Sequence, residues 1–201
     1  MRLVFASNNA HKLDEVRRIL PAGIEVLSLS DIGFEAEIEE TGTTLEQNSA
    51  IKAETVYQWL RVTGYGLPVD GVFADDTGLE IDALGGQPGV YTARWAGEPA
   101  ANRQKALAEL KDKTDRSAQF RTVITLIKFS AISDQYSETQ VSGIVRGRIA
   151  EEEYGQGGFG YDPVFIPEGY NKTFGELPAE VKNSISHRSR ALAELVKLLN
   201  C

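Results

Sequence analysis

Two adjacent carboxylates, Asp75 and Asp76, follow directly after the apolar residues 72–74. Side chains alternate between the two faces of a strand, so these carboxylates would point apart unless the chain turned. Thr77-Gly78 predicts such a turn. A carboxylate pair at the end of a strand suits Mg²⁺, which takes one or two protein carboxylates and completes its shell with water and substrate phosphate. The alternative is a solvent-exposed turn that binds nothing.

A further carboxylate, Glu40, lies just before residues 43–46, which have the Thr-x-x-Glu pattern of a capping box and predict the start of a helix. Asn48 and Lys52 are four residues apart in that helix and therefore lie on a common side of it. Both side chains could reach into one cleft while the apolar stripe of the helix packs on a sheet. The alternative for the acidic residues is a solvated loop.

The segment between the first expected strand and its helix has the composition of an anion site. A helix start offers backbone N–H groups and the positive end of the helix dipole, and Lys12 adds a point charge. The segment lacks the G-x-x-x-x-G-K-[ST] pattern, so a P-loop NTPase is disfavoured. An Asn-rich turn with a solvent-facing lysine is the alternative. The residues are Ser7, Asn8, Asn9, Ala10, His11 and Lys12.

A glycine-rich loop at residues 155–163 matches G-x-G-x-x-G, but an Asp-Pro pair and a strand follow it instead of a helix. This context excludes the dinucleotide-binding interpretation. The loop suits base recognition better, with Phe159 as a flat stacking surface and Asp162 as a hydrogen-bond acceptor. A hairpin loop with a buried aromatic side chain is the alternative.

Three cationic residues, Lys182, His187 and Arg188, lie before and within the first turn of the last expected helix. Cations at a helix N-terminus oppose the helix dipole and cost about 0.3 to 1 kcal/mol. This unfavourable placement indicates a use. The alternative is that Ser186 caps the helix while His187 and Arg188 point to water.

The apolar periodicity predicts the elements that must position these residues. Strands are expected at 3–6, 25–29, 72–75, 79–81 and 164–166, and helices at 12–20, 43–62, 100–113 and 186–199. Residues 118–130 and 136–149 predict long antiparallel strands joined by a turn at Ser133-Asp134. We therefore expect an α/β fold, a mixed sheet with a β-α-β opening and long antiparallel strands, in which two lobes surround a central cleft. Residues 1–201 are expected to form a single domain.

The composition excludes several classes of protein. The net charge of −8 argues against a nucleic-acid partner but allows a compact nucleotide whose phosphates are neutralised locally. No segment is long and apolar enough to predict a membrane span. The single cysteine, Cys201, has no partner within the chain, which fits a reducing compartment and predicts a cytoplasmic location.

Taken in order, the motifs resemble those of the inosine triphosphate pyrophosphatase family. They are S-N-N-A-H-K, E-E-T-G, N-x-x-x-K, A-D-D-T-G-L, L-G-G-x-P-G-x-Y-x-A-R, G-G-F-G-Y-D-P and S-H-R-x-x-A-L. The resemblance covers essentially the whole chain. It implies a Mg²⁺-dependent homodimer that hydrolyses non-standard purine nucleoside triphosphates such as ITP, dITP and XTP to the monophosphate and pyrophosphate.

The resemblance also implies a role for each matching residue. Asp76 would be the general base, Glu40 and Asp76 the metal carboxylates, and Asp75 their support. The triphosphate would be held by residues 7–12 and Lys52, with Thr77 beside the nucleotide. The base would be received by Phe159, Gly160, Tyr161, Asp162, Lys182, His187 and Arg188.

Two other functions remain open on the sequence alone. A Maf-type pyrophosphatase would keep the fold and act on modified pyrimidine triphosphates. A noncatalytic purine-nucleotide sensor would keep the pocket without turnover, although a sensor has no need of paired metal carboxylates beside phosphate-binding lysines.

Overall fold

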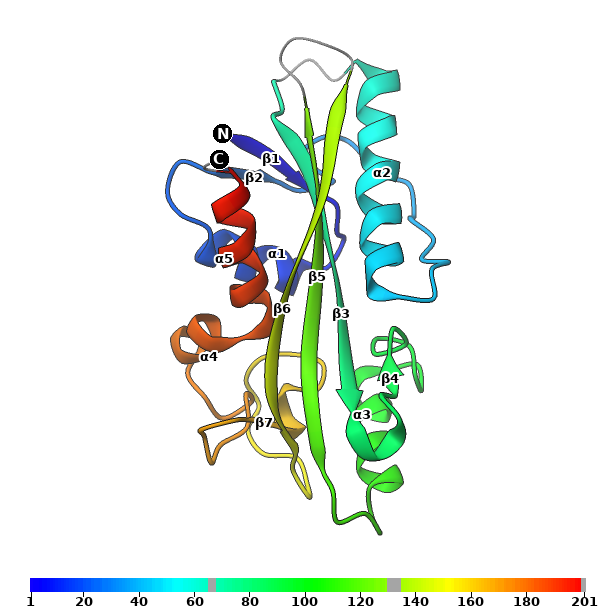
Figure 1. Cartoon of the computed structure of the whole chain (residues 1–201), viewed down its shortest axis with the longest axis vertical. Coiled ribbons are helices and arrows are strands. Elements are labelled where there is room, and N and C mark those ends of the chain that lie inside the picture. The colour runs from blue at the N-terminus through cyan, green and yellow to red at the C-terminus, as the bar shows by residue number, and fades with distance from the viewer. Residues whose placement is uncertain (65–67, 130–134, 200–201) are drawn as a thin grey trace. The chain divides into compact units, whose positions relative to one another are not determined.

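The computed structural model of the protein describes residues 1–64, 68–129 and 135–199. Within these residues the strands form a seven-stranded mixed sheet of order β2-β1-β3-β5-β6-β7, with β4 paired to β3 (Figure 1). The strands are β1 (Arg2–Phe5), β2 (Glu25–Leu27), β3 (Gly71–Ile81), β4 (Pro88–Gly89), β5 (Ser117–Phe129), β6 (Tyr136–Ile149) and β7 (Phe165–Pro167). The helices are α1 (Ala10–Ile19), α2 (Leu45–Thr63), α3 (Pro99–Glu109), α4 (Ala179–Ile185) and α5 (His187–Leu199). These elements confirm the mixed α/β fold class.

The chain divides into two compact units. Unit 1 comprises the described residues of 1–76, 123–142 and 191–201, and unit 2 comprises residues 77–122 and 143–190. Strands β3, β5 and β6 contribute residues to both units. The single domain and the central cleft expected from the sequence stay predictions.

Unit 1 is a three-layer α/β/α arrangement (Figure 1). β1 pairs in parallel with both β2 and β3. Neighbouring strand residues point to opposite faces, so Val4 packs with Ala53 and Val56 of α2, whereas Phe5 packs with Leu195 of α5 on the other face. The hydrophobic stripes of the helices thus hold both faces of the β1–β3 pair.

Unit 2 has a core of its own. Antiparallel pairs β3–β4 and β6–β7 supply strands to it. Leu79 of β3, Phe120 of β5 and Phe165 of β7 are buried there together with Ala106 of α3. The rings of Phe120 and Phe165 pack edge to face with centroids 4.7 Å apart.

The start of α2 lies one residue later than the predicted capping box. Thr44 is the N-cap, and its Oγ1 accepts a hydrogen bond from the backbone N–H of Gln47 at 3.2 Å. The side-chain oxygen of Gln47 accepts in turn from the backbone N–H of Thr43 at 2.7 Å. Gln47 therefore takes the place of Glu46 as the side chain that reaches back, but it bonds the N–H before the N-cap and not that of the N-cap itself, so the predicted capping box is kept only in part.

A short helix that the sequence analysis does not predict, α4, comes directly before α5. Ser186 lies between the two helices. Its backbone N–H closes α4 on the carbonyl of Lys182 at 2.9 Å, and its hydroxyl accepts from the N–H of Ser189 at 3.2 Å at the start of α5. The Ser186 cap, which the sequence analysis gave only as part of the alternative, is thus present, and Lys182 lies in α4.

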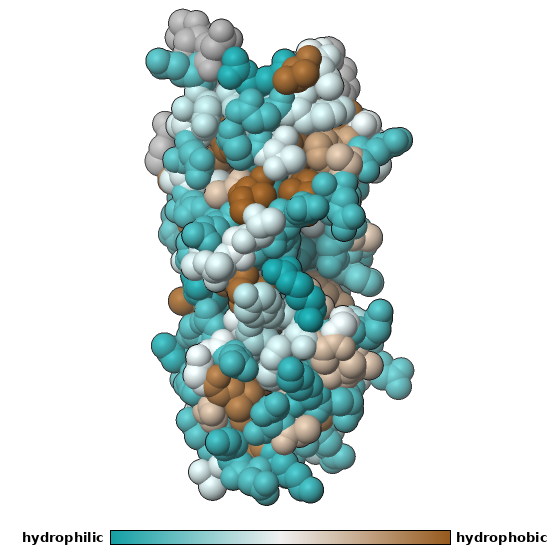
Figure 2. Space-filling view, turned by 90° about the vertical axis from the view of Figure 1, so that its right-hand side faces the viewer, coloured by the Kyte–Doolittle hydropathy of each residue, from teal (hydrophilic) through white to brown (hydrophobic). Residues whose placement is uncertain are grey.

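Among the described residues, no helix combines the length and the apolarity that crossing a bilayer requires. On the face shown in Figure 2, hydrophilic side chains predominate and hydrophobic ones lie in small separate groups. Three predicted features lie outside the described residues: the strand end at Ser130, the turn at Ser133-Asp134, and Cys201.

Candidate active site

The two adjacent carboxylates lie inside β3, because the expected turn at Thr77-Gly78 is absent and the strand continues to Ile81. Asp75 and Asp76 are 1% and 7% exposed. Alternation along the strand directs them to opposite faces. Each carboxylate forms an ion pair with a lysine on its own face of the strand. The two charges are therefore stabilised without a turn, and the predicted turn is wrong.

On the face of Asp75, the Nζ of Lys12 donates to Oδ1 of Asp75 at 2.9 Å. Lys12 lies in the first turn of α1. The cap of that helix is Asn9, whose side chain accepts from the backbone N–H of Lys12 at 3.1 Å. Ser7 accepts from the N–H of Asn9 at 3.3 Å, while Asn8, Ala10 and His11 are exposed. Three N–H groups of the expected anion seat, those of Ser7, Asn9 and Lys12, therefore already have acceptors.

On the face of Asp76, Lys52 of α2 is shared by two carboxylates. Its Nζ lies 2.5 Å from Oε1 of Glu40 and 3.4 Å from Oδ1 of Asp76. One turn earlier on the same helix, Asn48 donates from Nδ2 to Oδ2 of Asp76 at 3.3 Å and accepts from the N–H of Gly42 at 2.8 Å. The i, i+4 pair expected from the sequence thus meets the predicted catalytic carboxylate.

Burial sets the protonation balance of this cluster. It raises the pKa of Asp76 above its ordinary value, against the charges of Lys52 and Lys12. Burial is also the largest influence on Lys52 and lowers its pKa, but the three carboxylates together outweigh it, so the pKa is raised overall. Lys52 therefore stays charged, and Asp76 is a stronger base than an ordinary aspartate.

A divalent metal would need carboxylate ligands at this site. Within the described part of the chain, no three His, Cys, Asp or Glu side chains gather into one metal-binding group. Glu40 and Asp76 nevertheless share one cation, the ammonium group of Lys52. Mg²⁺ needs only one or two protein carboxylates, so this pair fits such an ion, whereas Asp75 is engaged by Lys12.

In unit 2, a buried ion pair lies under the predicted stacking residue. The Nζ of Lys182 donates to Oδ2 of Asp162 at 2.7 Å, and the same oxygen accepts the backbone N–H of Phe159 at 2.7 Å. Lys182 lies 4.7 Å and the guanidinium of Arg188 5.7 Å from the centre of the Phe159 ring. The structure therefore brings together four of the residues predicted to receive the base.

The remaining cations of this group are buried. Arg188 is 1% and His187 4% exposed, so the alternative in which they point to water is wrong. Arg188 donates from Nη2 to Oγ1 of Thr77 at 3.4 Å. Nδ1 of His187 lies 2.6 Å from Oγ1 of Thr122, which lies 2.8 Å from Oγ1 of Thr77. Thr122 was missed in the sequence because a threonine within a β-branched run reads as strand packing.

Tyr161 and Gly160, also predicted to receive the base, contact other parts of unit 2. Tyr161 lies in the hydrophobic core of unit 2, where burial raises the pKa of its phenol and its hydroxyl has no hydrogen-bond partner among the described residues. The carbonyl of Gly160 accepts from Nη1 of Arg103 at 2.9 Å. The substrate contacts expected of both residues stay predictions.

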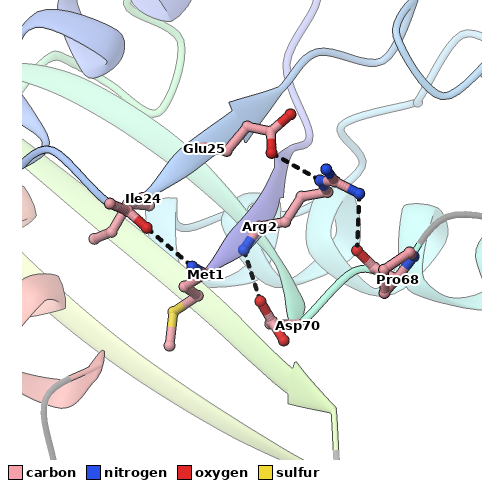
Figure 3. Close-up of a pocket in the computed structure, with 7 residues that line it drawn as sticks. Met1, Arg2, Ile24, Glu25, Pro68 and Asp70 are labelled. Atoms are coloured by element: carbon pink, nitrogen blue, oxygen red, sulfur yellow. Dashed lines mark hydrogen bonds and ion pairs between the residues drawn. The ribbon is translucent and has the colours of Figure 1, made fainter.

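Two hollows are lined by residues that do not belong to these clusters. The first, of about 490 Å³, surrounds the start of β1 (Figure 3). Its charged groups pair with one another: Arg2 contacts Glu25 at 2.9 Å, and its backbone N–H donates to Asp70 at 2.6 Å (Figure 3). The second, of about 410 Å³, lies in unit 2, where exposed Arg146 and Arg148 share it with carboxylates. No residue predicted for the site lines either of these two hollows.

The comparisons with known proteins decide the family. The sequence model of the Ham1 family matches residues 3–198. The chain belongs to the Ham1 family. Similar curated Ham1 relatives include the dITP/XTP pyrophosphatase of Flavobacterium johnsoniae, 48% identical over 99% of this chain and 98% of the relative. The dITP/XTP pyrophosphatase of Bacillus subtilis is 47% identical over 98% of this chain and 96% of the relative.

Solved Ham1 structures agree with this assignment. The Staphylococcus aureus Ham1 protein has a TM-score of 0.83 and 38% identity, covering 100% of this chain and 98% of that one. A structure named nucleoside-triphosphatase / dITP/XTP pyrophosphatase from Mycobacterium abscessus has a TM-score of 0.72 and 40% identity, covering 97% and 98%. The resemblance drawn from the motifs is thereby confirmed.

Proposed function

We propose that this Ham1-family protein hydrolyses ITP, dITP and XTP to the nucleoside monophosphate and pyrophosphate, and so removes non-standard purines from the nucleotide pool. The observation that carries the proposal is the shared contact of Lys52 with Glu40 and Asp76. It supports a site in which Lys52 would bind phosphate beside Asp76 as the general base. The relatives named dITP/XTP pyrophosphatase support the substrate class.

Asp76 is the proposed general base. Water attacks the α-phosphorus, the bond to the oxygen bridging the α- and β-phosphates breaks, and pyrophosphate leaves without a covalent intermediate. The carboxylate of Asp76 accepts the proton of the attacking water. Its raised pKa makes it a stronger base, and the hydrogen bond from Asn48 fixes its orientation.

Cationic side chains neutralise the triphosphate in this mechanism. Lys12 and Lys52 are the proposed phosphate contacts, together with the turn at residues 7–11. Glu40 and Asp76 are the proposed ligands of Mg²⁺, with Asp75 in support. When bound, this ion would supply further stabilisation of the charge that develops on pyrophosphate.

Base selection is assigned to the cluster in unit 2. Phe159 offers a stacking surface, and the donors of Lys182 and Arg188 suit the 6-oxo acceptor of hypoxanthine and xanthine. The amino group of adenine would leave these donors unmatched. Sites built on such hydrogen bonds discriminate by up to about 10⁴- to 10⁵-fold.

Pyrophosphate release is the direct test. The purified protein would be given ITP, dITP, XTP, ATP, GTP, dUTP and methylated dTTP, with Mg²⁺ or with EDTA. We expect Mg²⁺-dependent release from the first three. Asp76→Asn should lower kcat at least about 100-fold, whereas Asp14→Asn, at an exposed position of α1, should leave it unchanged.

Three results would contradict the proposal. Preference for modified pyrimidine triphosphates would indicate a Maf-type enzyme. Tight ITP binding without product in a single-turnover experiment would indicate a sensor. Full turnover by Asp76→Asn would remove the general base.

The proposal includes a cytoplasmic homodimer without a nucleic-acid partner. Trp59 and Trp95 pack against the cores of units 1 and 2, while Tyr91 is 52% exposed and is the better candidate for an interface. Light scattering would give the oligomeric state, and a DNA and RNA mobility-shift assay should show no complex.

A further inference from the structure

An arginine of α3, Arg103, bridges two residues that lie on either side of the segment 154–159. Its Nε donates to Oε2 of Glu153, just before the glycine loop, at 2.9 Å. Its Nη1 donates to the backbone carbonyl of Gly160, within the loop, at 2.9 Å. One guanidinium group therefore holds both ends of this segment, and the mechanism above gives it no role.

The carboxylate of Glu153 is itself held in place. Its Oε1 accepts from Nε2 of Gln104 at 2.9 Å, while its Oε2 accepts from Arg103. Gln104 and Arg103 are neighbours on α3, so two successive side chains of one helix bind the two oxygens of one carboxylate. This arrangement orients the guanidinium group toward Gly160. Arginine suits the position because its planar fork presents several donors in fixed directions.

Gly160 is the residue at which the loop could pivot. Its φ angle is +60°, and a Cβ placed on it would meet no atom of the described residues within 4 Å. Glycine adopts positive and negative φ angles with similar ease, so the backbone alone does not fix this corner. Residues 161–164, directly after it, are buried. The bond from Arg103 to the Gly160 carbonyl therefore limits the rotation of Phe159 relative to that buried segment.

The segment before Gly160 needs such restraints. Residues 154–158 are exposed and include three glycines, whose backbones lose the most freedom when they become ordered. The N–H of Tyr154 donates to the carbonyl of Pro163 at 2.8 Å, and the N–H of Gly157 donates to the carbonyl of Gly175 at 2.9 Å. Arg103 adds a connection from both ends of the segment to α3 and so narrows the range of conformations that the loop can adopt.

We propose that Arg103 is a positioning residue, which holds Glu153 and Gly160 together and thereby keeps Phe159 in the orientation that stacks on the base of the substrate. This inference rests on the proposed function for its substrate. The order of the loop is a property of the free protein. Because Arg103 acts through the loop, its loss should weaken binding of the nucleotide and leave the chemical step unchanged.

Hydrogen–deuterium exchange tests the positioning without any substrate. In Arg103→Met, which keeps an unbranched side chain and removes both bonds, the backbone amides of residues 157–162 should exchange at least about fivefold faster. Arg103→Lys keeps the charge without the fork and should give an intermediate rate. Exchange of these amides at the wild-type rate in Arg103→Met would overturn the proposal whatever the kinetics show.

Steady-state kinetics test the consequence for the substrate. Arg103→Met should raise the KM for ITP by about fivefold to tenfold and change kcat by less than about twofold. Glu153→Gln weakens the same bridge without altering Arg103 and should raise the KM by a smaller factor, about twofold to fivefold. A purely structural role would lower the Tm without separating KM from kcat. An unchanged KM in both variants would overturn the proposal.

A matched control lies in unit 1, where Arg17 also bridges a carboxylate and a backbone carbonyl. Its Nη2 lies 3.0 Å from Oδ2 of Asp31 and 2.9 Å from the carbonyl of Val26. Arg17→Met should lower the Tm but leave both the KM for ITP and the exchange of residues 157–162 unchanged. An equal rise in KM in the two methionine variants would overturn the proposal. Absence of any ITP hydrolysis in the wild type would instead contradict the proposed function, and the exchange rates would still decide whether Arg103 orders the loop.

Discussion

The ammonium nitrogen of Lys52 lies 3.4 Å from Oδ1 of Asp76. The pKa of Lys52 is raised, and the pKa of Asp76 is raised as well, although a nearby cation lowers the pKa of a carboxyl. Burial raises the pKa of Asp76. Burial is also the largest influence on Lys52 and lowers its pKa, yet the nearby carboxylates together reverse that effect. Three carboxylates, those of Glu40, Asp75 and Asp76, form these ion pairs with two ammonium groups, those of Lys12 and Lys52.

Removing Lys52 should make the protein depend on a divalent ion for stability. Lys52→Met leaves Glu40 and Asp76 without their shared cation, and breaking a buried pair lowers the free energy of unfolding by about 3 kcal/mol. Mg²⁺ at roughly a hundredfold excess over its Kd should raise the free energy of unfolding of this variant by about 2 to 3 kcal/mol. Thermal unfolding with Mg²⁺ and with EDTA measures both effects. Lys111→Met, at an exposed position, is the control and should show neither. A Tm of Lys52→Met that does not respond to Mg²⁺ would argue against a metal site here.

The buried pair of Asp162 and Lys182 should behave as one energetic unit. The two side chains are 4% and 6% exposed, so removal of either partner takes this ion pair from a buried charge. Asp162→Ala and Lys182→Met should each lower the free energy of unfolding by about 3 to 5 kcal/mol. In the double variant the free energy of unfolding should fall by clearly less than the sum of the decreases in the two single variants. Urea unfolding of all four proteins gives the coupling, and simple additivity would contradict a direct interaction.

The sequence predicts most of the fold because the helices and strands of unit 1 bury one-sided apolar stripes with clear periods. It also predicts that Asn48 and Lys52 meet one target, since an i, i+4 spacing fixes a common side of a helix. It does not predict that β3 runs on beyond Asp76. Whether adjacent carboxylates need a turn depends on cations brought by other elements, here Lys12 and Lys52, and no local pattern contains that information.

The limits of the site prediction have a similar cause. Tyr161 follows the stacking residue in a glycine-rich loop, and nothing in that pattern shows that its ring belongs to the core. Thr122 has the branched side chain of a strand former, so its hydroxyl is hidden among packing residues. Both roles arise from contacts between segments that are distant in the sequence.

Two glycines of the loop separate backbone strain from displacement of Asp162. Gly158 and Gly160 both have positive φ angles, of 70° and 60°. A Cβ on Gly158 would lie 2.0 Å from Oδ2 of Asp162, whereas one on Gly160 would meet nothing within 4 Å. In both alanine variants the strained backbone should lower the free energy of unfolding by about 1 to 2 kcal/mol. Gly158→Ala should lower the free energy of unfolding further and raise the KM for ITP, because its Cβ also displaces Asp162, which pairs with Lys182. Equal stability of the two variants would show that the loop adapts without moving Asp162.

The carboxyl of Asp31, in the turn that follows β2, should make the stability of unit 1 depend on pH. Oδ2 of Asp31 accepts from the N–H of Ser28 at 2.8 Å and from Arg17 at 3.0 Å. The hydrogen bond from the Ser28 backbone is the main reason why the pKa of Asp31 lies below its ordinary value of 3.8. The folded protein therefore binds this proton more weakly than the unfolded chain does. The resulting stability is present above pH 3.8 and is lost as the pH falls through the folded-state pKa.

Asp31→Asn should accordingly lower the Tm at neutral pH and have no such effect in strong acid. The side chain is 45% exposed, so solvent screens the interaction and the decrease should be small, about 1 to 3 °C. Scanning calorimetry of both proteins over a pH series gives the difference in Tm at each pH. Asp14→Asn, an exposed carboxyl of α1, serves as the control, because the loss of a charge there should shift the Tm by less. A contact that depends on the charge of Asp31 disappears when its carboxyl is protonated. A Tm difference between the wild type and Asp31→Asn that stays constant down to strong acid would therefore contradict this prediction.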